Sequence, residues 1–308
     1  MGVRFREAMH EALYGSEGFY VRHRPARHFR TSAQSPVFAR ALARLVCQVD
    51  TALGHPARLD VVDVGAGSGE LLTNLLASLP PEVLRRTRPV AVELPTVVPP
   101  AGTGTPIDWR HEPPRDITGV LLATEWLDNI PLDLAENGRY LWDGAPLADE
   151  DAAWIRQWWP GTTGTVEIGL SRDRAWASVV AGLTAGLALT VDYGHLSGTR
   201  PQHSTVAGFR DGRETEPRFD GSTDITCSVA MDSAGRATGV RYRLKTQREM
   251  LRALGVDGAR PPLELAHEDP AGYVRALAAA SEAATLLDPQ GLGAHWWLQH
   301  VVGIRLTQ

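Results

Sequence analysis

Leu59-Asp-Val-Val-Asp-Val-Gly65-Ala-Gly67-Ser-Gly69-Glu-Leu-Leu-Thr-Asn-Leu-Leu76 is the stretch that decides the fold of this 308-residue chain. Its first six residues are typical of a strand buried on both faces, because three of them are apolar, β-branched valines. After the glycines, leucines recur at helical spacing. The stretch therefore predicts a strand, a tight turn and a helix. Glycine permits positive φ and a close backbone approach, so a ligand can meet free N–H groups at the helix start.

The glycine spacing distinguishes between two cofactors. A dinucleotide fingerprint reads G-x-G-x-x-G, but here the glycines fall at 65, 67 and 69, and Glu70 occupies the position of the third fingerprint glycine. This spacing favours S-adenosylmethionine. The next expected strand, Pro89-Val-Ala-Val-Glu93-Leu, ends in a carboxylate that can accept hydrogen bonds from both ribose hydroxyls. Glu93 therefore argues against the alternative, a glycine turn that only connects a strand to a helix.

Composition is that of an ordinary globular protein, with 43% hydrophobic and 22% charged residues. A formal net charge of −5 argues against a nucleic-acid partner and would attract a basic substrate. Cys47 and Cys227 are far apart, which indicates neither a disulfide framework nor a zinc cluster. The ten histidines lack the short spacings of a metal site, so we expect no metal.

No apolar run suggests a secretory signal or a membrane span, so we expect a cytoplasmic protein without a membrane partner. Strands alternate with helices along the chain, which predicts an α/β fold: a Rossmann-like parallel sheet with helices on both faces, an N-terminal helical segment and inserted loops or hairpins. The further strands are expected at 105–109, 119–124, 186–194 and 295–306. The helices are expected at 4–14, 36–50, 172–183, 246–254 and 269–287.

Four segments are expected along the chain. They are an N-terminal helical cap (1–56), a cofactor-binding core (57–195), an irregular substrate-side insertion (196–245), and C-terminal helices with the closing strand (246–308). A hairpin insertion near 132–160 is expected from the turn signal Asn137-Gly138. The cluster Trp154, Trp158 and Trp159 within it is more typical of a core than of a ligand platform.

Acidic residues follow two of the expected core strands. Glu125 and Asp128 come after the fourth strand and Asp192 ends the fifth. Because ligands bind at the carboxyl ends of parallel strands, these acids are expected at one edge. An alternative is that Asp128 caps a helix and Glu125 interacts with its dipole. Likewise, Thr31 and Ser32 could bind cofactor or substrate, or the cluster could simply provide the N-cap Ser35.

Several separated segments together resemble the MidA-type methyltransferases, which include the mitochondrial complex I assembly methyltransferase. The segments are Ala12-Leu-Tyr with Gly18-Phe-Tyr20, Phe29-x-Thr31-Ser32 with Ser35-Pro36-x-Phe38, Val64-Gly-Ala-Gly-Ser-Gly-Glu-Leu, Glu125-x-x-Asp128-x-x-Pro131, Asp192-Tyr-Gly194, Asp224-Ile-Thr226 and Thr246-Gln247. They span nearly the whole chain in the family's order.

The resemblance implies a class I methyltransferase fold that binds S-adenosylmethionine, and its mitochondrial relatives methylate an arginine of a respiratory-complex subunit. The residues expected at the cofactor are Asp63, Gly65, Ala66, Gly67, Gly69, Glu93, Thr124, Thr31 and Ser32. The chain departs from the family pattern at two places: Arg27-His28 replaces a Gly-Asp pair, and Thr124 replaces an asparagine.

Methyl transfer from a sulfonium requires alignment and a desolvated nucleophile. If the acceptor is a guanidinium, carboxylates must orient it and offset its charge, which makes Glu125, Asp128 and Asp192 the candidate catalytic residues. The first hypothesis is therefore a protein methyltransferase, with arginine as the acceptor. The alternatives are a small-molecule methyltransferase, whose pocket the tryptophan cluster would line, and an assembly protein that has lost turnover. The acceptor and the oligomeric state do not follow from the sequence.

Overall fold

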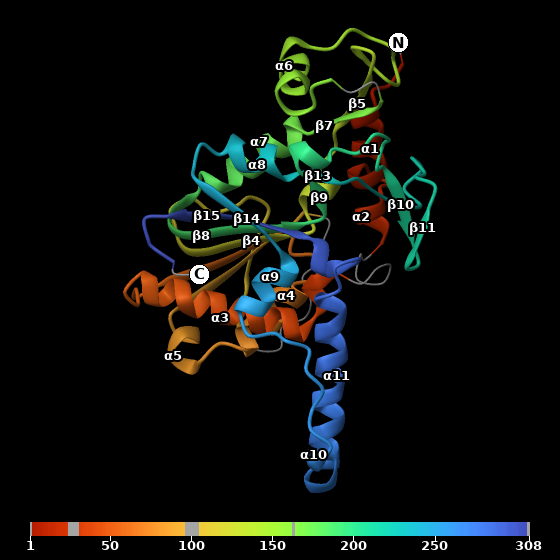
Figure 1. Ribbon diagram of the computed structural model, residues 1–308. Coiled ribbons are helices and arrows are strands. Elements are labelled where there is room, and N and C mark those ends of the chain that lie inside the picture. Colours follow the sequence, from red (N-terminus) through yellow and green to blue (C-terminus); the bar gives the residue numbers. More distant parts are fainter. Residues whose placement is uncertain (1, 24–30, 96–104, 162–163, 307–308) are drawn as a thin grey trace.

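The computed structural model describes residues 2–23, 31–95, 105–161 and 164–306. A seven-stranded sheet lies at the centre, with helices on both of its faces (Figure 1). Its strands are β1 (Leu59–Val64), β2 (Thr87–Val92), β3 (Asp108–Arg110), β4 (Ile117–Thr124), β8 (Leu183–Asp192), β14 (Tyr242–Thr246) and β15 (Trp296–Val302).

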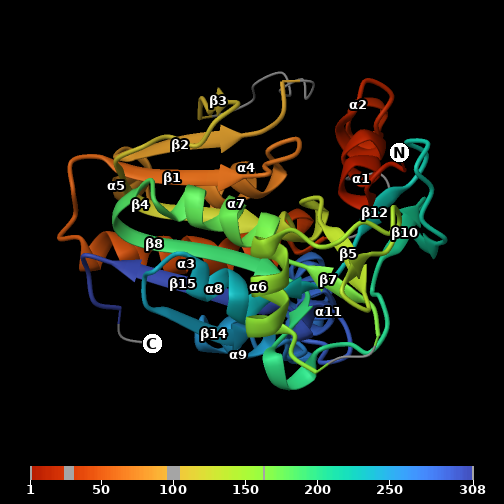
Figure 2. The same cartoon turned by 90° about the horizontal axis from the view of Figure 1, so that it is seen from above.

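The strand order is β14-β15-β8-β4-β1-β2-β3. The strands from β8 to β3 pair in parallel, whereas β15 is antiparallel to both of its neighbours. Figure 2 shows this sheet from above, with the carboxyl ends of β1, β2 and β4 directed to the same side. The predicted α/β fold with a class I arrangement is confirmed.

Alternate residues of the central strands supply the two halves of the core. On one face, Val61 and Val120 pack with α3 (Pro36–Ala52), α4 (Glu70–Ala77), α9 (Gln247–Ala253) and the end of α11 (Pro270–Leu286). On the other face, Val62 and Leu121 pack with α7 (Leu170–Val180) and α8 (Met231–Ala237). Successive side chains of a strand point to opposite faces of the sheet, so one apolar run packs against the helices on both faces.

The N-terminal helices lie beside the carboxyl edge of the sheet. Figure 1 shows α1 (Phe5–Tyr14) and α2 (Phe19–Arg22) next to a group of short strands. Phe5, Met9 and Leu13 are buried there against Leu134 and Ile225. The short strands in this region are β5 (Asp133–Glu136), β6 (Arg139–Tyr140), β7 (Val166–Ile168), β10 (Ala207–Arg210), β11 (Arg213–Thr215) and β12 (Asp224–Thr226).

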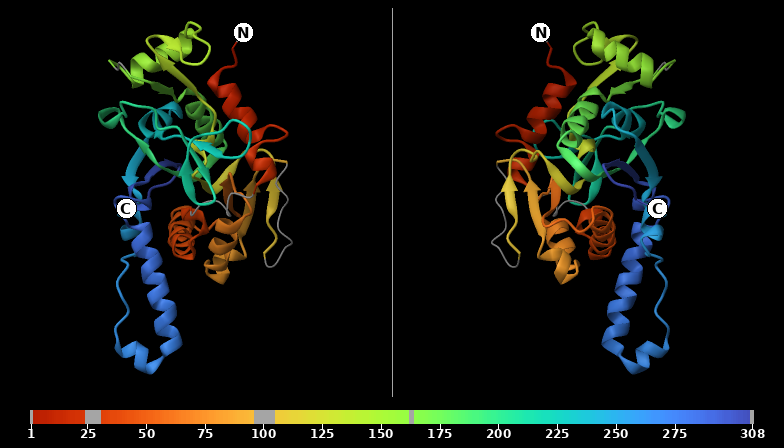
Figure 3. Two further views of the ribbon diagram at one scale, coloured as in Figure 1. Left: turned by 90° about the vertical axis from the view of Figure 1, so that its right-hand side faces the viewer. Right: turned by 90° about the vertical axis from the view of Figure 1, so that its left-hand side faces the viewer.

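The predicted hairpin at Asn137-Gly138 is present between β5 and β6, and both turn residues have positive φ. Three further short helices are α5 (Pro81–Leu84), α6 (Asp149–Trp158) and α10 (Glu264–Glu268). Figure 3 shows α10 and α11 projecting together from the body of the molecule as a helical arm. Along the described residues, no helix has both the length and the apolar character that a membrane crossing requires.

The expectation that 196–245 is an irregular insertion is wrong in part. The segment contains the small sheet β10–β12, the two-residue strand β13 (Val229–Ala230) paired with β9 (Gly194–His195), and helix α8. Its last residues form β14, an edge strand of the main sheet. Strands of two to four residues carry too little periodicity for a sequence pattern to reveal them.

Gly119, in the middle of the sheet, has a strict steric role. Gly119 in β4 has φ of 147°, and a Cβ at this position would lie 2.0 Å from the carbonyl oxygen of Asp60 on β1. A side chain there would push the two central strands apart. Glycine at 119 therefore permits the close approach of β4 to β1.

Gly119→Ala should lower the free energy of unfolding by at least about 2 kcal/mol, because it combines backbone strain with a clash against main chain. Gly239→Ala is the control, since Gly239 also has positive φ but a Cβ there meets no atom within 4 Å. The control should lose only about 1 kcal/mol. Denaturant unfolding monitored by circular dichroism measures both, and equal losses would contradict the close-approach argument.

Candidate functional site

The glycine turn predicted from the sequence links β1 to α4. Gly65, Gly67 and Gly69 all have positive φ, between 55° and 77°. A Cβ at Gly65 would meet Trp126 at 2.7 Å and one at Gly69 would meet Trp109 at 3.0 Å. A Cβ at Gly67 would meet nothing within 4 Å. The turn is therefore flanked by two indole rings and open at its middle glycine, which is the geometry that a closely bound ligand requires.

Glu93 lies next to this open glycine, at the end of β2. Its Oε2 accepts a hydrogen bond from the Gly67 backbone N–H at 2.7 Å, and its Oε1 accepts one from the Leu94 N–H at 2.8 Å. Burial raises the pKa of Glu93, while these two N–H groups lower it. The carboxylate and the glycine turn are therefore in direct contact, and their joint binding of the cofactor stays a prediction.

Asp63 on β1 is close enough to Glu93 for their charges to interact, and it is almost fully buried. Desolvation, together with the charge of Glu93, raises its pKa to about 7. Within the described part of the chain, its Oδ2 is buried without a hydrogen-bond partner. An unpaired buried carboxylate oxygen beside an open glycine suits a cofactor that carries an ammonium and ribose hydroxyls, so these residues fit S-adenosylmethionine.

Glu125 follows β4 in a strained backbone conformation. Its φ of 51° lies in the left-handed region, which costs a non-glycine residue about 1–2 kcal/mol. The backbone N–H of Glu125 donates to the carbonyl of Val191 at 2.7 Å, and its Oε1 accepts from the Ser32 N–H at 2.9 Å. Desolvation raises the pKa of this carboxyl to about 8, against the opposing effect of the Ser32 N–H. Strain of this kind clusters at functional sites.

Asp128 and Asp192 lie deeper than Glu125. Asp192 is fully buried, and its Oδ2 accepts from the backbone N–H groups of Leu127 and Asp128, in the 3-10 turn η3 (Leu127–Asn129). Burial and the charges of Asp128 and Glu125 raise its pKa well above the usual range. Asp192 therefore orients the turn that carries Asp128, and its position does not favour the predicted direct contact with an acceptor.

Asp128 is held by two hydroxyl groups. Its Oδ2 accepts from Tyr193 at 2.8 Å and from Thr226 at 2.7 Å, and these two hydroxyls also contact each other. Among the described residues its Oδ1 has no partner. Burial raises the pKa of Asp128, opposed chiefly by these two hydroxyls. The second oxygen thus has acceptor capacity that no described residue uses.

Two tyrosines of the N-terminal helices reach the same edge, which the sequence did not predict. Tyr14 donates to the Asn129 carbonyl at 3.0 Å, and Tyr20 donates to Asp224 Oδ1 at 3.1 Å. Their rings stack with centroids 5.5 Å apart. Burial raises the pKa of Asp224 to about 7, and the charge of Asp128 adds to this effect. The only sequence signal was that these residues lie in the segments that resemble the family.

Arg172 is the buried cation of the site and was also missed. It is 1% exposed. Its guanidinium donates to four backbone carbonyls and to the sulfur of Cys227. The four carbonyls belong to residues 128, 130, 227 and 228, so Arg172 joins the turn η3 to the loop after β12. Its charge also lowers the pKa of Asp128. A single arginine within a predicted helix carries no pattern that reveals this role.

The other residues named from the sequence are placed as follows. Ser35 caps α3 by accepting a hydrogen bond from the Phe38 N–H at 3.1 Å, which is the N-cap role predicted for it from the sequence. Ser32 is fully buried and Thr124 nearly so, while Thr31 precedes the 3-10 turn η2 (Ser32–Gln34). Arg27-His28 and Phe29 lie outside the described residues. Searching the described residues finds no group of histidine, cysteine and acidic side chains that could hold a metal.

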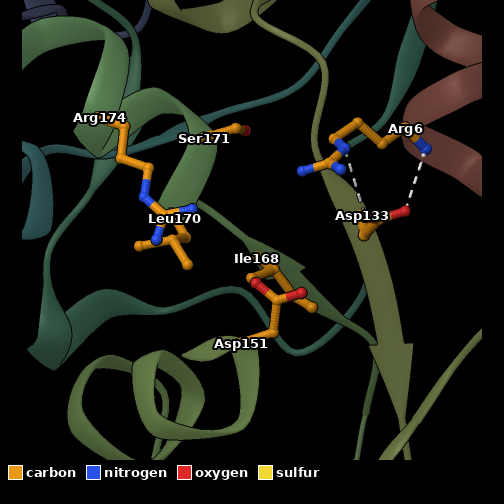
Figure 4. A pocket seen from close by; sticks show the side chains of 7 residues that line it. All are labelled: Arg6, Asp133, Asp151, Ile168, Leu170, Ser171 and Arg174. Carbon is orange, nitrogen blue, oxygen red and sulfur yellow. Dashed lines mark hydrogen bonds and ion pairs between the residues drawn. The ribbon is translucent and has the colours of Figure 1, made fainter. Parts of the chain in front are cut away.

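A separate small cavity lies between α1, β5 and α7. Figure 4 shows Arg6, Asp133, Asp151 and Arg174 among its lining residues, with two contacts from Arg6 to Asp133. The Arg6 backbone N–H donates to Asp133 Oδ1 at 3.1 Å, and Arg4 pairs with Oδ2 at 2.6 Å. None of its lining residues was predicted to bind cofactor or acceptor. This cavity instead marks where the N-terminal helix is anchored.

The chain is similar to known proteins in both sequence and structure. Residues 41–144 match the family model described as "putative S-adenosyl-L-methionine-dependent methyltransferase". This segment includes the glycine turn, Glu93, Glu125 and Asp128. The match confirms the resemblance stated from the sequence motifs and supports an S-adenosylmethionine-dependent methyltransferase. A search of the curated proteins finds no match.

Two solved structures are similar over almost the whole chain. One is a COG1565 superfamily member from Burkholderia thailandensis bound to S-adenosyl-homocysteine, with 22% identity, a TM-score of 0.78, and coverage of 99% of this chain and 89% of that chain. The other is a native COG1565 superfamily protein from the same organism, with 21% identity, a TM-score of 0.77, and coverage of 99% and 88%. At these identities the likeness establishes the fold.

Gly67→Val should abolish binding of S-adenosylhomocysteine, because the added side chain would fill the open space at the middle of the turn. Gly54→Val is the matched control: Gly54 also has positive φ and an open Cβ position, but lies at the end of α3. Both variants should lose about 1–2 kcal/mol of stability from strain. Calorimetric titration should show lost affinity only for the first, and unchanged affinity in a folded Gly67→Val protein would place the cofactor elsewhere.

Glu93→Ala should weaken the binding of S-adenosylhomocysteine by about 1.5–3 kcal/mol, the range for hydrogen bonds to a charged group. This corresponds to roughly 10- to 150-fold in dissociation constant. The same titration measures it, and Glu70→Ala provides a control on an exposed acid of the neighbouring helix. A dissociation constant within twofold of the original would rule out a ribose contact.

Proposed function

We propose that this methyltransferase transfers a methyl group from S-adenosylmethionine to a nitrogen of a protein side chain, with arginine as the acceptor. The observation that carries the proposal is the strained Glu125, close enough to Asp128 for their charges to interact, together with the Asp128 Oδ1, which has no partner among the described residues. These are two carboxylates with free acceptor capacity at the edge where the cofactor residues also lie. A guanidinium, with five donors and a permanent charge, is the side chain that such a pair suits.

Three tyrosines near the acidic residues are further evidence for a cationic acceptor. Tyr14, Tyr20 and Tyr193 each contact this acidic region through a hydroxyl group. Aromatic faces attract cations, and hydroxyls can hold carboxylates in a fixed orientation. The net charge of −5 would also favour the approach of a basic partner.

The chain's residues would act mainly by alignment. Glu93, Gly67 and Asp63 would hold the cofactor, which supplies an electrophilic methyl group on a sulfonium. Glu125 and Asp128 would accept hydrogen bonds from the guanidinium, direct one nitrogen at the methyl and offset the positive charge. Burial strengthens these interactions because little water screens them. Asp192 would act through η3, by fixing the position of Asp128.

A small-molecule acceptor receives less support. Trp154 and Trp159 are buried in the core of the inserted sheet, and Trp158 packs against it. Trp154 donates to Asp173 and Ser233. These contacts give the tryptophan cluster the core role that the sequence favoured. The predicted cytoplasmic location and the lack of nucleic-acid and membrane partners stay predictions.

Product analysis separates the two acceptor classes. The purified protein is incubated with methyl-labelled S-adenosylmethionine and a host lysate, which is then divided into protein and small-molecule fractions. Label in the protein fraction, recovered as methylarginine after hydrolysis, would support the proposal. Label confined to small molecules would overturn it.

Glu125→Gln should retain affinity for S-adenosylhomocysteine but lose at least about tenfold in transfer to the protein fraction, or about 1.4 kcal/mol of transition-state stabilisation. The change keeps the shape and removes the charge. Glu136→Gln, which alters a half-buried acid of the inserted hairpin, is the control. If Glu125 only stabilises the turn, melting temperature should fall while turnover per folded molecule stays the same.

The same variant tests a pH dependence. Burial raises the pKa of Glu125 to about 8, so the group is mostly protonated below that pH in the free enzyme. A cation is bound by the ionised form, and the arginine acceptor does not itself titrate in this range. kcat/KM for the acceptor should therefore rise as pH passes from about 7 to 9. Glu125→Gln should flatten this rise, and an unchanged profile would exclude Glu125 as the titrating group.

A further inference from the structure

Gln247 is a fully buried amide that the proposed function leaves without a role. It is the first residue of α9 and belongs to the Thr-Gln pair that the sequence singled out. Thr246 caps the helix by accepting from the Glu249 N–H, and Glu249 reaches back to the Thr246 N–H. Helix α9 therefore begins without help from the Gln247 side chain, which points into the protein.

The orientation of the Gln247 amide is fixed by its neighbours. Its Oε1 lies 3.4 Å from the indole N–H of Trp297, which can only donate, and its Nε2 lies 3.3 Å from the carbonyl of Leu286, which can only accept. The Ser32 hydroxyl lies 3.3 Å from Oε1 and 3.2 Å from Nε2. The hydroxyl thus completes the hydrogen bonding of the amide on both sides, so Ser32 is held in one position.

Ser32 connects this amide to the proposed acceptor site. Its hydroxyl faces Gln247, while its backbone N–H donates to Oε1 of Glu125 at 2.9 Å. Ser32 and Gln247 are both fully buried, so water does not compete for these contacts. Three contacts in series therefore run from the core indole of Trp297 to the carboxylate of Glu125.

We propose that Gln247 is a positioning residue, which acts through Ser32 to set the orientation of the Glu125 carboxylate for methyl transfer. The proposal deepens the proposed function and rests on it, since Glu125 is the group that would orient the acceptor. Backbone strain at Glu125 makes such support necessary, because a residue in the left-handed region keeps that conformation only when its surroundings hold it there.

Gln247→Met tests the proposal, since methionine has a similar length but cannot form the hydrogen bonds. Gln299→Met is the matched control: Gln299 is also buried, on β15, and its amide contacts Met250 rather than Ser32. Both variants are examined as the full chain. The first measurement is made by NMR and needs no acceptor. The side-chain carboxyl carbons of glutamate are labelled with ¹³C, and the Glu125 resonance is assigned by its absence in Glu125→Gln. The pH titration of this resonance then gives the pKa of Glu125.

The Ser32 N–H favours the ionised carboxylate, so loss of its alignment should raise the pKa of Glu125. In Gln247→Met the NMR midpoint should move up by about half a pH unit or more, and transfer to the lysate protein fraction should fall at least about fivefold at saturating S-adenosylmethionine. Affinity for S-adenosylhomocysteine should stay within about twofold. Gln299→Met should change none of these. An unchanged midpoint in a folded Gln247→Met protein would overturn the proposal.

Two further variants keep the test decisive. If Gln247→Met does not fold, Ser32→Ala removes only the hydroxyl and should produce the same rise in midpoint. In a Glu125→Gln background, Gln247→Met should cause no additional loss of transfer, because the two residues act in one series. An equal additional loss there would also overturn the proposal. By contrast, full activity of Glu125→Gln with a shifted NMR midpoint in Gln247→Met would overturn the proposed function and leave the structural connection intact.

Discussion

The parallel pairing of β1 with β2 and β4 is the constraint on which the site depends. Its register sets Val64 against Val92 and Ala123, so the residues that follow these three strands come together at one edge. The glycine turn, Glu93 and Glu125 are brought together in this way from separate parts of the sequence. The reversed strand β15 adds to the same edge, because its first residue, Trp296, pairs with the last residues of β8 and β14.

Concentrating acids at one buried edge creates an electrostatic problem. Burial raises the pKa of each carboxyl, and neighbouring carboxylates raise it further. Hydroxyl groups, backbone N–H groups and the guanidinium of Arg172 partly offset this cost, since each favours the ionised form. Among the described residues, single oxygens of Asp63 and Asp128 stay without a hydrogen-bond partner, and unused acceptors suit a ligand that brings donors.

The fold followed from the sequence wherever the periodicity was long. The valine-rich β1, the leucine-rich α4 and the helix starting at Pro36 were predicted within a few residues because their burial repeats over several turns or strand positions. The edge of the sheet where the cofactor is expected could be predicted for the same reason, because it lies at the carboxyl ends of those strands. The short strands around β10 to β13 gave no such signal.

The acceptor side depends on contacts between distant segments, which no single segment encodes. Tyr20 lies 204 positions from Asp224 and Gln247 lies 215 from Ser32, and their side chains form hydrogen bonds. The motifs identified these residues, but their partners follow only from the tertiary arrangement. Asp192 shows the opposite case: its position at a strand end was foreseen, whereas its complete burial was not.

The arm formed by α10 and α11 buries far fewer residues than the body of the molecule, so its local stability differs. Of the 17 residues of α11, only Ala280, Ala283 and Leu286 are buried, all toward its carboxyl end. Its outer turns contribute no buried residue to the core, so they can fray independently of it. Amide hydrogens near Pro270 should thus exchange with solvent through local opening, whereas those near Leu286 should exchange only when the larger structure opens.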